Sequence, residues 1–161
     1  MKKFILFFSL ILMLFSTHSL LAQKINWVVG GRFGLSVVSA GGGSSTGLQL
    51  GPMAEAKFNR NMAVGTEFNI NTQGGTPIEW ADYFKYYFDV QGSKIKPYVN
   101  GGFSLWFFTG GPYFGLRFGG GANFPIAPKL YIPADIQLGP VFTSGTSVFY
   151  FAITSGIRYE L

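Results

Sequence analysis

The stretch that decides the fold is the carboxyl-terminal segment Val148–Leu161, VFYFAITSGIRYEL. Every second side chain in it is apolar or aromatic apart from one serine, and this set is Phe149, Phe151, Ile153, Ser155, Ile157, Tyr159 and Leu161. The residues between them include Gly156 and the charge pair Arg158 and Glu160. A period of two places alternate side chains on opposite faces of a β-strand. The segment therefore predicts a strand with one apolar and one polar face.

The same alternation recurs in seven earlier segments. They are Asn26–Val38, Gly47–Phe58, Ala63–Asn71, Ile78–Phe88, Pro97–Phe108, Tyr113–Phe124 and Leu130–Gly139. An even number of alternating segments of roughly 10 residues is typical of an outer-membrane β-barrel. The sequence predicts an all-β fold, an eight-stranded antiparallel up-and-down transmembrane β-barrel. Pro52 and Pro133 do not fit, because proline cannot donate to a β-ladder, and we expect a bulge or a strand end near Pro52.

The first residues have the pattern of a secretory signal peptide. Lys2 and Lys3 precede the apolar run Phe4–Phe15, which is shorter than the roughly 20 residues of a membrane-spanning helix. Small residues follow, and we expect cleavage after Ala22. Residues 1–22 are thus predicted to be a signal peptide, and residues 23–161 one barrel domain.

Composition excludes several functions. The chain has no cysteine, and its one histidine is His18 in the predicted signal peptide. Thiolate metal sites, disulfides and histidine-based catalysis are therefore excluded from the mature chain. We predict no enzyme activity, no cofactor and no metal. The formal charge of +5 falls to +3 without Lys2 and Lys3, and no basic run remains, so nucleic-acid binding has no support.

Charged residues follow the polar phase of the predicted strands. The candidate interior network contains Arg32, Glu55, Lys57, Glu67, Glu79, Lys85, Arg117, Asp135, Arg158 and Glu160. The five basic and five acidic residues balance. Among charged residues within the strands, Asp82 alone falls in the apolar phase, and we expect it at the membrane boundary, where a charge costs less.

A charged face must point into the barrel, because Arg or Lys facing lipid near the midplane costs roughly 2–4 kcal/mol. An eight-stranded barrel is just wide enough for side chains to fill it. We therefore predict a filled, neutral core. Hairpin geometry predicts an Arg32–Glu55–Glu67 cluster with a contribution from Lys57, and it makes Arg117 and Asp135 neighbours.

A soluble alternative reverses the two faces. In a secreted, lipocalin-like binder of small apolar ligands, the charges would face water and the other face would form the core. That face is rich in aromatic residues such as Trp27, Phe33, Trp80 and Phe118. This aromatic volume favours an outer belt in contact with lipid.

The chain also resembles a known class, the small eight-stranded outer-membrane barrels of Gram-negative bacteria. It is similar to OmpA/OmpX-like and porin-family outer membrane proteins of Bacteroidota type. The residues that carry the resemblance are Lys85–Phe88, then Lys96–Val99 after a short turn, and Gly156–Tyr159. The resemblance implies that Ile157, Tyr159 and Leu161 carry the signal for the barrel-assembly machinery. Members often end in phenylalanine, whereas this chain ends in Leu161.

These observations predict a structural or interaction protein of the cell envelope. With an even number of strands both termini lie in the periplasm, and the predicted loops Ser39–Thr46, Thr72–Pro77, Thr109–Pro112 and Pro140–Ser147 are extracellular. We expect a monomer in contact with outer-membrane lipid and lipopolysaccharide. One alternative is a narrow porin-like channel for small solutes. Another is a lipid-acting enzyme using Glu55 and Glu67 as paired carboxylates, which the nearby Arg32 disfavours.

Overall fold

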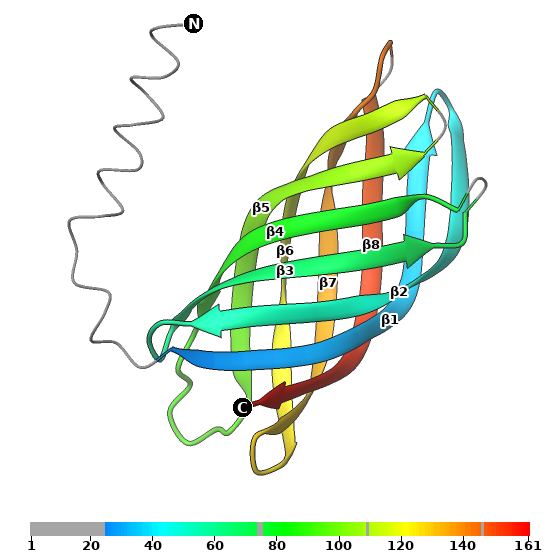
Figure 1. The fold of residues 1–161 in the computed structure, drawn as a ribbon. Coiled ribbons are helices and arrows are strands. Elements are labelled where there is room, and N and C mark those ends of the chain that lie inside the picture. Colours follow the sequence, from blue (N-terminus) through cyan, green and yellow to red (C-terminus); the bar gives the residue numbers. More distant parts are fainter. Residues whose placement is uncertain (1–24, 74–75, 109, 146) are drawn as a thin grey trace, which may run out of the picture.

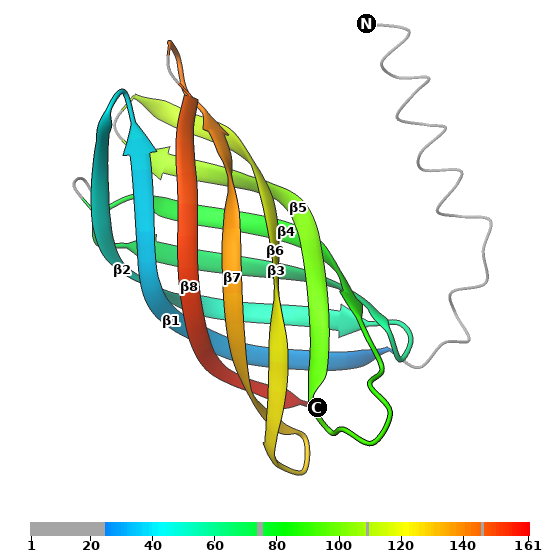
Figure 2. The same cartoon turned by 180° about the vertical axis from the view of Figure 1, so that it is seen from behind.

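The computed structural model describes residues 25–73, 76–108, 110–145 and 147–161. The predicted signal peptide, its cleavage point and His18 lie outside them. Within these ranges eight strands form one closed antiparallel barrel, in which sequence neighbours pair and β1 pairs with β8 (Figures 1 and 2). The strands are β1 (Asn26–Ala40), β2 (Gly43–Lys57), β3 (Met62–Asn71), β4 (Ile78–Tyr87), β5 (Lys96–Phe108), β6 (Gly111–Ala127), β7 (Leu130–Phe142) and β8 (Ser147–Glu160). No helix of the described chain is long and apolar enough to cross a membrane.

The two phases of each strand face opposite sides of the barrel wall, which confirms the predicted alternation. Apolar side chains point outward and stay exposed, as with Phe33 at 64% and Ile153 at 55%. The charged side chain of Arg32, next to Phe33 in β1, is buried at 4%. The core of this protein is therefore polar, and its apolar surface is on the outside.

The hairpin between β1 and β2 is tighter than the sequence predicts. Ala40 pairs with Gly43, so Gly41 and Gly42 alone form the turn, with φ of +55° and +89°. Two-residue hairpin turns need positive φ, which glycine adopts without steric cost. The predicted loop at 39–46 is thus mostly strand.

Two of the other three loops at this end are also shorter than predicted, whereas β3 ends at Asn71 and β4 begins at Ile78, as predicted for the loop at 72–77. Gly111 and Pro112 belong to β6, and β7 continues to Phe142. The ladder extends into both predicted loops, so that Phe108 pairs with Gly111 and Phe142 with Ser147. The loops of the barrel therefore have little surface of their own.

The predicted bulge at Pro52 is absent. Leu50 pairs with Ile70 and Met53 with Glu67, so the register between β2 and β3 is the same on both sides of the proline. Pro52 lies opposite Gly31 within the paired length of β2. The register shift that does occur lies between Pro125 and Ala127 in β6, next to the turn into β7.

Asp82 is not at a strand end, contrary to expectation. It lies near the middle of β4, opposite Thr66 of β3 and Phe103 of β5. Its phase faces outward, between Trp80 and Phe84, which are 47% and 43% exposed. The alternation of β4 places Asp82 on the outer face, because the residues two positions before and after it, Trp80 and Phe84, are aromatic and face outward.

Candidate functional site

The interior of the barrel contains eight charged side chains, all buried in the described structure. The positive ones are Arg32, Lys85, Arg117 and Arg158, and the negative ones are Glu55, Glu67, Glu79 and Asp135. Alternate positions on seven of the strands aim these groups at the barrel axis. A charge in such a place must be paired and hydrogen-bonded, or its desolvation would oppose folding. The pairs are therefore the main feature of the site.

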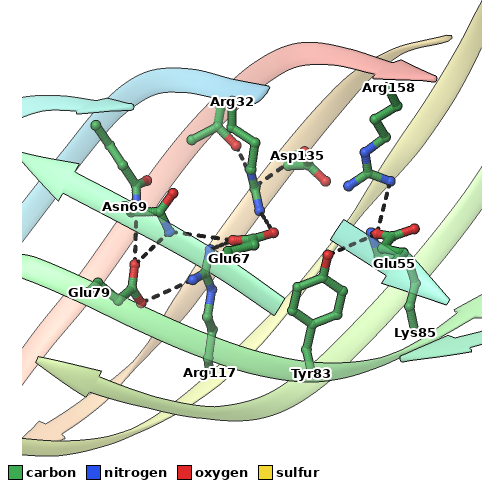
Figure 3. A network of polar contacts seen from close by, with 12 residues as sticks. Arg32, Glu55, Glu67, Asn69, Glu79, Tyr83, Lys85, Arg117, Asp135 and Arg158 are labelled. Atoms are coloured by element: carbon green, nitrogen blue, oxygen red, sulfur yellow. Dashed lines mark hydrogen bonds and ion pairs between the residues drawn. The ribbon is translucent and has the colours of Figure 1, made fainter. Parts of the chain in front are cut away.

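Glu67 of β3 is the hub of the network (Figure 3). Its carboxylate accepts from Arg32 of β1 and, at 2.7 Å, from Arg117 of β6. Each arginine also reaches a second carboxylate, Arg32 to Asp135 at 3.2 Å and Arg117 to Glu79 at 3.0 Å. These contacts cross the lumen rather than follow one hairpin. They connect five strands through the middle of the barrel.

A second group surrounds Glu55 of β2. Lys85 donates to Glu55 Oε1, and Arg158 Nη1 lies 3.4 Å from the same oxygen. The hydroxyls of Tyr83 and Tyr87 also donate to this carboxylate, at 2.9 and 2.6 Å. The Lys85 ammonium lies 4.4 Å from the ring centroid of Tyr98, an additional cation–π contact. The charge of Glu55 is thus balanced, and both of its carboxylate oxygens accept hydrogen bonds.

Toward the loop end of the lumen, amide and hydroxyl side chains take the place of the charged ones. Gln49 and Asn69 donate to Glu79 at 3.1 and 3.0 Å, and Tyr150 donates to Gln49 at 2.8 Å. Beyond Tyr150 an apolar cluster begins with Trp106. The charged groups therefore end below the loops, although on the β1 side Gln73 of the 72–77 loop still donates to the Ser36 hydroxyl at 2.5 Å.

An apolar cavity of about 180 Å³ lies at this end of the lumen. Trp106, Phe108, Val38 and Val141 contribute to its lining. Beneath it, Trp106 packs edge-on against Tyr150 with ring centroids 4.9 Å apart. The two rings close the cavity toward the charged interior.

At the opposite end, Lys57 and Glu160 form an ion pair of 3.0 Å. Their side chains are 12% and 22% exposed, so this pair marks the rim of the lumen. The ten predicted network residues therefore divide into eight fully buried ones and this rim pair.

Glycines lie opposite the buried arginines and let the neighbouring strands approach closely, a feature that the sequence analysis missed. Arg32 has Gly51 opposite it on β2 and Gly156 opposite it on β8. A Cβ on Gly51 would lie 1.9 Å from the Phe68 carbonyl oxygen, and one on Gly156 would lie 2.0 Å from the Gly31 oxygen. Only glycine allows strands to approach so closely. The same pairing recurs in the barrel, because Arg117 lies opposite Gly102 and Arg158 lies opposite Gly30. A correct strand register would therefore have been enough to find these arginine–glycine pairs from the sequence.

The structure corrects two of the predicted contacts. Arg32 binds Glu67 as expected, but Glu55 pairs with Lys85 and Arg158, and Lys57 pairs with Glu160. The tight glycine turn places Arg32 opposite Gly51 and Glu55 opposite Val28. Glu55 is therefore four positions along β2 from the residue that faces Arg32.

Arg117 and Asp135 are also not neighbours, contrary to expectation. Asp135 lies opposite Gly121 on β6, and its carboxylate turns across the lumen to Arg32. The Tyr98 hydroxyl donates to the other oxygen of Asp135. Arg117 points to Glu67 and Glu79 instead.

The arrangement does not form a paired-carboxylate catalytic site. Glu55 and Glu67 belong to separate ion-pair groups, and both are buried at 2% exposure or less. A general acid and base need access to substrate and to water. Neither carboxylate has that access in this structure.

The predicted assembly-signal residues lie on the outer face near the termini. Ile157, Tyr159 and Leu161 are 57%, 44% and 61% exposed. Ile157 and Tyr159 lie opposite Gly31 and Val29 of β1, along the line where the barrel closes.

Comparison with solved structures places this architecture. The chain superimposes on Neisserial surface protein A, NspA, with a TM-score of 0.73 at 16% identity, over 84% of this chain and 97% of that one. The fold is that of the small eight-stranded outer-membrane β-barrels. The amino-terminal barrel domain of Pseudomonas aeruginosa OprF matches with a TM-score of 0.64 at 10% identity, over 86% of this chain and 98% of that one.

OprG, an outer membrane protein of P. aeruginosa, matches with a TM-score of 0.58 at 12% identity, over 86% of this chain and 97% of that one. No family model and no curated protein matches the sequence. At these identities the likeness is one of fold, and the resemblance to small outer-membrane barrels predicted from the sequence is confirmed at that level.

Proposed function

We propose that the chain is an integral protein of the bacterial outer membrane with a structural or interaction role and a lumen closed by its own side chains. The observation that carries the proposal is the interior network of four positive and four negative buried groups in the described residues. Each of the eight has an opposite charge within 3.4 Å. A lumen filled in this way has no continuous path for a solute.

The exterior supports the membrane location. Aromatic and aliphatic side chains from all eight strands are exposed there, among them Trp27 at 51% and Phe118 at 50%. Water would strongly oppose such a surface, whereas lipid favours it. A soluble lipocalin-like binder needs an apolar interior, and the interior here is polar. That alternative is not supported.

The start of β1 and the carboxyl terminus lie at one end of the barrel, together with the turns that join β2 to β3, β4 to β5 and β6 to β7 (Figure 1). In the proposed orientation this termini end faces the periplasm, and the four short loops face outward from the cell. The apolar belt contacts lipid and the acyl chains of lipopolysaccharide. We expect the barrel to act as a monomer, because each buried charge has an opposite charge within the same chain.

The proposal includes recognition by the barrel-assembly machinery through Ile157, Tyr159 and Leu161. Their outward exposure beside the β1–β8 line would let another protein contact the last strand before closure. Because the chain ends in Leu161 rather than phenylalanine, Leu161→Phe is expected to support assembly at least as well as the native residue.

The first test is gel mobility of the outer-membrane fraction, unboiled against boiled in detergent. A closed barrel migrates faster before boiling, because it remains compact. A single mobility, with the protein recovered in the soluble periplasm, would refute the membrane location.

The second test separates a closed lumen from a narrow channel. Purified protein in a planar bilayer should show no discrete conductance steps. The double variant Glu67→Ser with Arg117→Ser removes two opposite charges and the bulk that fills the lumen, and it should open measurable conductance. Steps in the native protein as large as those of the variant would favour the porin-like channel instead.

A further inference from the structure

The two ends of the barrel differ sharply in charge. The loop segments 39–47, 72–77, 109–112 and 140–147 contain no Asp, Glu, Lys or Arg. At the termini end, Arg60 pairs with Asp89 at 3.3 Å, and Lys57 pairs with Glu160. Lys94, Lys96 and Lys129 have no ion pair with any described residue. Lysines without an ion pair among the described residues are therefore concentrated at one end, with Lys94 and Lys129 exposed and Lys96 half-buried.

These three lysines surround one hollow. It measures about 520 Å³ and is lined by Lys94 from the segment before β5, by Lys96 at the start of β5 and by Lys129 in the turn from β6 to β7. Both segments lie beside the carboxyl terminus in both views (Figures 1 and 2). We call Lys94, Lys96 and Lys129 the lysine cradle. Mutual repulsion opposes such a group unless an anion binds it.

Lys129 has a second unusual property. Its φ is +64°, in the left-handed region that residues other than glycine rarely adopt. Its carbonyl accepts from the Glu160 amide at 2.9 Å, so the turn is fixed in this conformation. Glycine would fit there without strain, as it does at Gly41 and Gly42. Strained positions of this kind cluster at ligand-binding sites.

The walls of the hollow add an apolar side. Ile126 lines it and is 55% exposed, and Phe124, outside the hollow and two residues earlier on the same outer face of β6, is 40% exposed. Tyr131 lies at its inner edge. A ligand that contacts both surfaces must join an anionic group to an apolar chain. Basic pockets at a membrane surface bind anionic lipid head groups in this way.

We propose that the lysine cradle binds the phosphate head group of an anionic phospholipid, with its acyl chains along Phe124 and Ile126. The inference rests on the membrane location of the proposed function. In the proposed orientation the lipid belongs to the periplasmic leaflet. The bound lipid would hold the end of the barrel that carries the carboxyl terminus at a defined depth in the membrane. The loop segments at the opposite end contain no charged residues that could bind a head group in this way.

Native mass spectrometry of the folded full-length mature protein in mild detergent tests this site, with phosphatidylglycerol and phosphatidylcholine as probes. The native chain should retain one phosphatidylglycerol at a concentration on the order of tenfold lower than phosphatidylcholine. The variant K94Q/K96Q/K129Q should lose this preference. The control K57Q/R60Q removes positive charge from the same end outside the cradle and should keep it.

Equal retention of the two lipids by the native chain would overturn the proposal, as would loss of preference in the control. Inorganic phosphate is the competing anion: if it displaces the lipid at equal concentration, the cradle is a free-anion site and the lipid assignment is wrong. The gel-mobility test on every variant separates these outcomes from failure of the barrel to fold.

The single variant Lys129→Gly distinguishes a binding residue from a turn residue. Glycine relieves the strain at φ of +64° and removes the ammonium group. We expect an unfolding midpoint equal to or above that of the native chain, together with weaker retention of phosphatidylglycerol. Unchanged lipid retention in Lys129→Gly would show that Lys129 serves the turn alone.

Discussion

Replacing Glu67 by glutamine tests the interior network at its hub. Glutamine keeps the shape of the side chain and removes its charge. Glu67 binds both Arg32 and Arg117, so the change affects two ion pairs at once. The described interior would then hold four positive groups against three negative ones.

The expected magnitude follows from the partners that remain. Arg32 keeps Asp135 at 3.2 Å, and Arg117 keeps Glu79 at 3.0 Å. Loss of one partner from a buried pair costs about 3–5 kcal/mol. Because each arginine retains a carboxylate, we expect a loss near the lower limit, about 3 kcal/mol of unfolding free energy. This loss corresponds to a decrease on the order of a hundredfold in the folding equilibrium.

The assay is denaturant unfolding of the barrel in lipid vesicles, followed by tryptophan fluorescence and by gel mobility. Lys57→Gln is the matched control, because it breaks the partly exposed pair with Glu160 at 3.0 Å. A partly exposed pair contributes less, and we expect a loss below about 1 kcal/mol. The difference between the two variants therefore measures the effect of burial.

A double variant completes the test. Adding Arg32→Met to Glu67→Gln restores charge balance, with three groups of each sign, and Asp135 still accepts from the Tyr98 hydroxyl. We expect the double variant to be less destabilised than the sum of its two single variants, because the two residues interact directly. A loss for Glu67→Gln no larger than that of Lys57→Gln would refute the role of Glu67 as the hub.

Three further predictions follow from the barrel wall. Gly156→Ala places a Cβ 2.0 Å from a backbone oxygen and should lower the unfolding free energy by about 1–3 kcal/mol. In Gly31→Ala the nearest contact of the new Cβ is 3.8 Å away, so the loss should stay within about 0.5 kcal/mol. Equal losses for the two variants would show that close strand approach is not the cause. Asp82→Leu should stabilise the barrel in vesicles by about 1 kcal/mol, since it removes a lipid-facing carboxylate, and a loss of stability would indicate an unrecognised contact. Deletion of 159–161 should reduce assembly in cells, measured as the fraction with shifted gel mobility, while Lys129→Gly should not.

The sequence is sufficient to predict the wall of this barrel but not its interior contacts. Strand positions and the phase of each face depend on a period of two, which is local, and Phe33 and Arg32 already show opposite sides of β1. The partners of Arg32 depend instead on where distant strands lie across the lumen. Asp135 of β7 reaches it only because the barrel closes. Hairpin geometry describes adjacent strands and cannot supply this information.

Three of the four loops at one end were predicted too long, for a different reason. Gly and Ser near Gly41 and Gly42 are typical of loops, yet they also tolerate strand pairing, and the tertiary ladder extends into them. Pro52 was expected to distort β2, yet the ladder accommodates it without a change of register. In both places the closed sheet overrides local preference.

The ion pairs that cross the line between β1 and β8 have a consequence for how the chain reaches its final shape. Arg32 of the first strand lies 3.2 Å from Asp135 of β7, and Arg158 of the last strand lies 3.4 Å from Glu55 of the second. Before the seam forms, Arg158 lacks Glu55 and Asp135 lacks Arg32, whereas Arg32 keeps Glu67 and Glu55 keeps Lys85 within strands β1 to β4. The pairing of β1 with β8 therefore brings these two ion pairs together, so that closure of the barrel and completion of its buried charge network occur in one step.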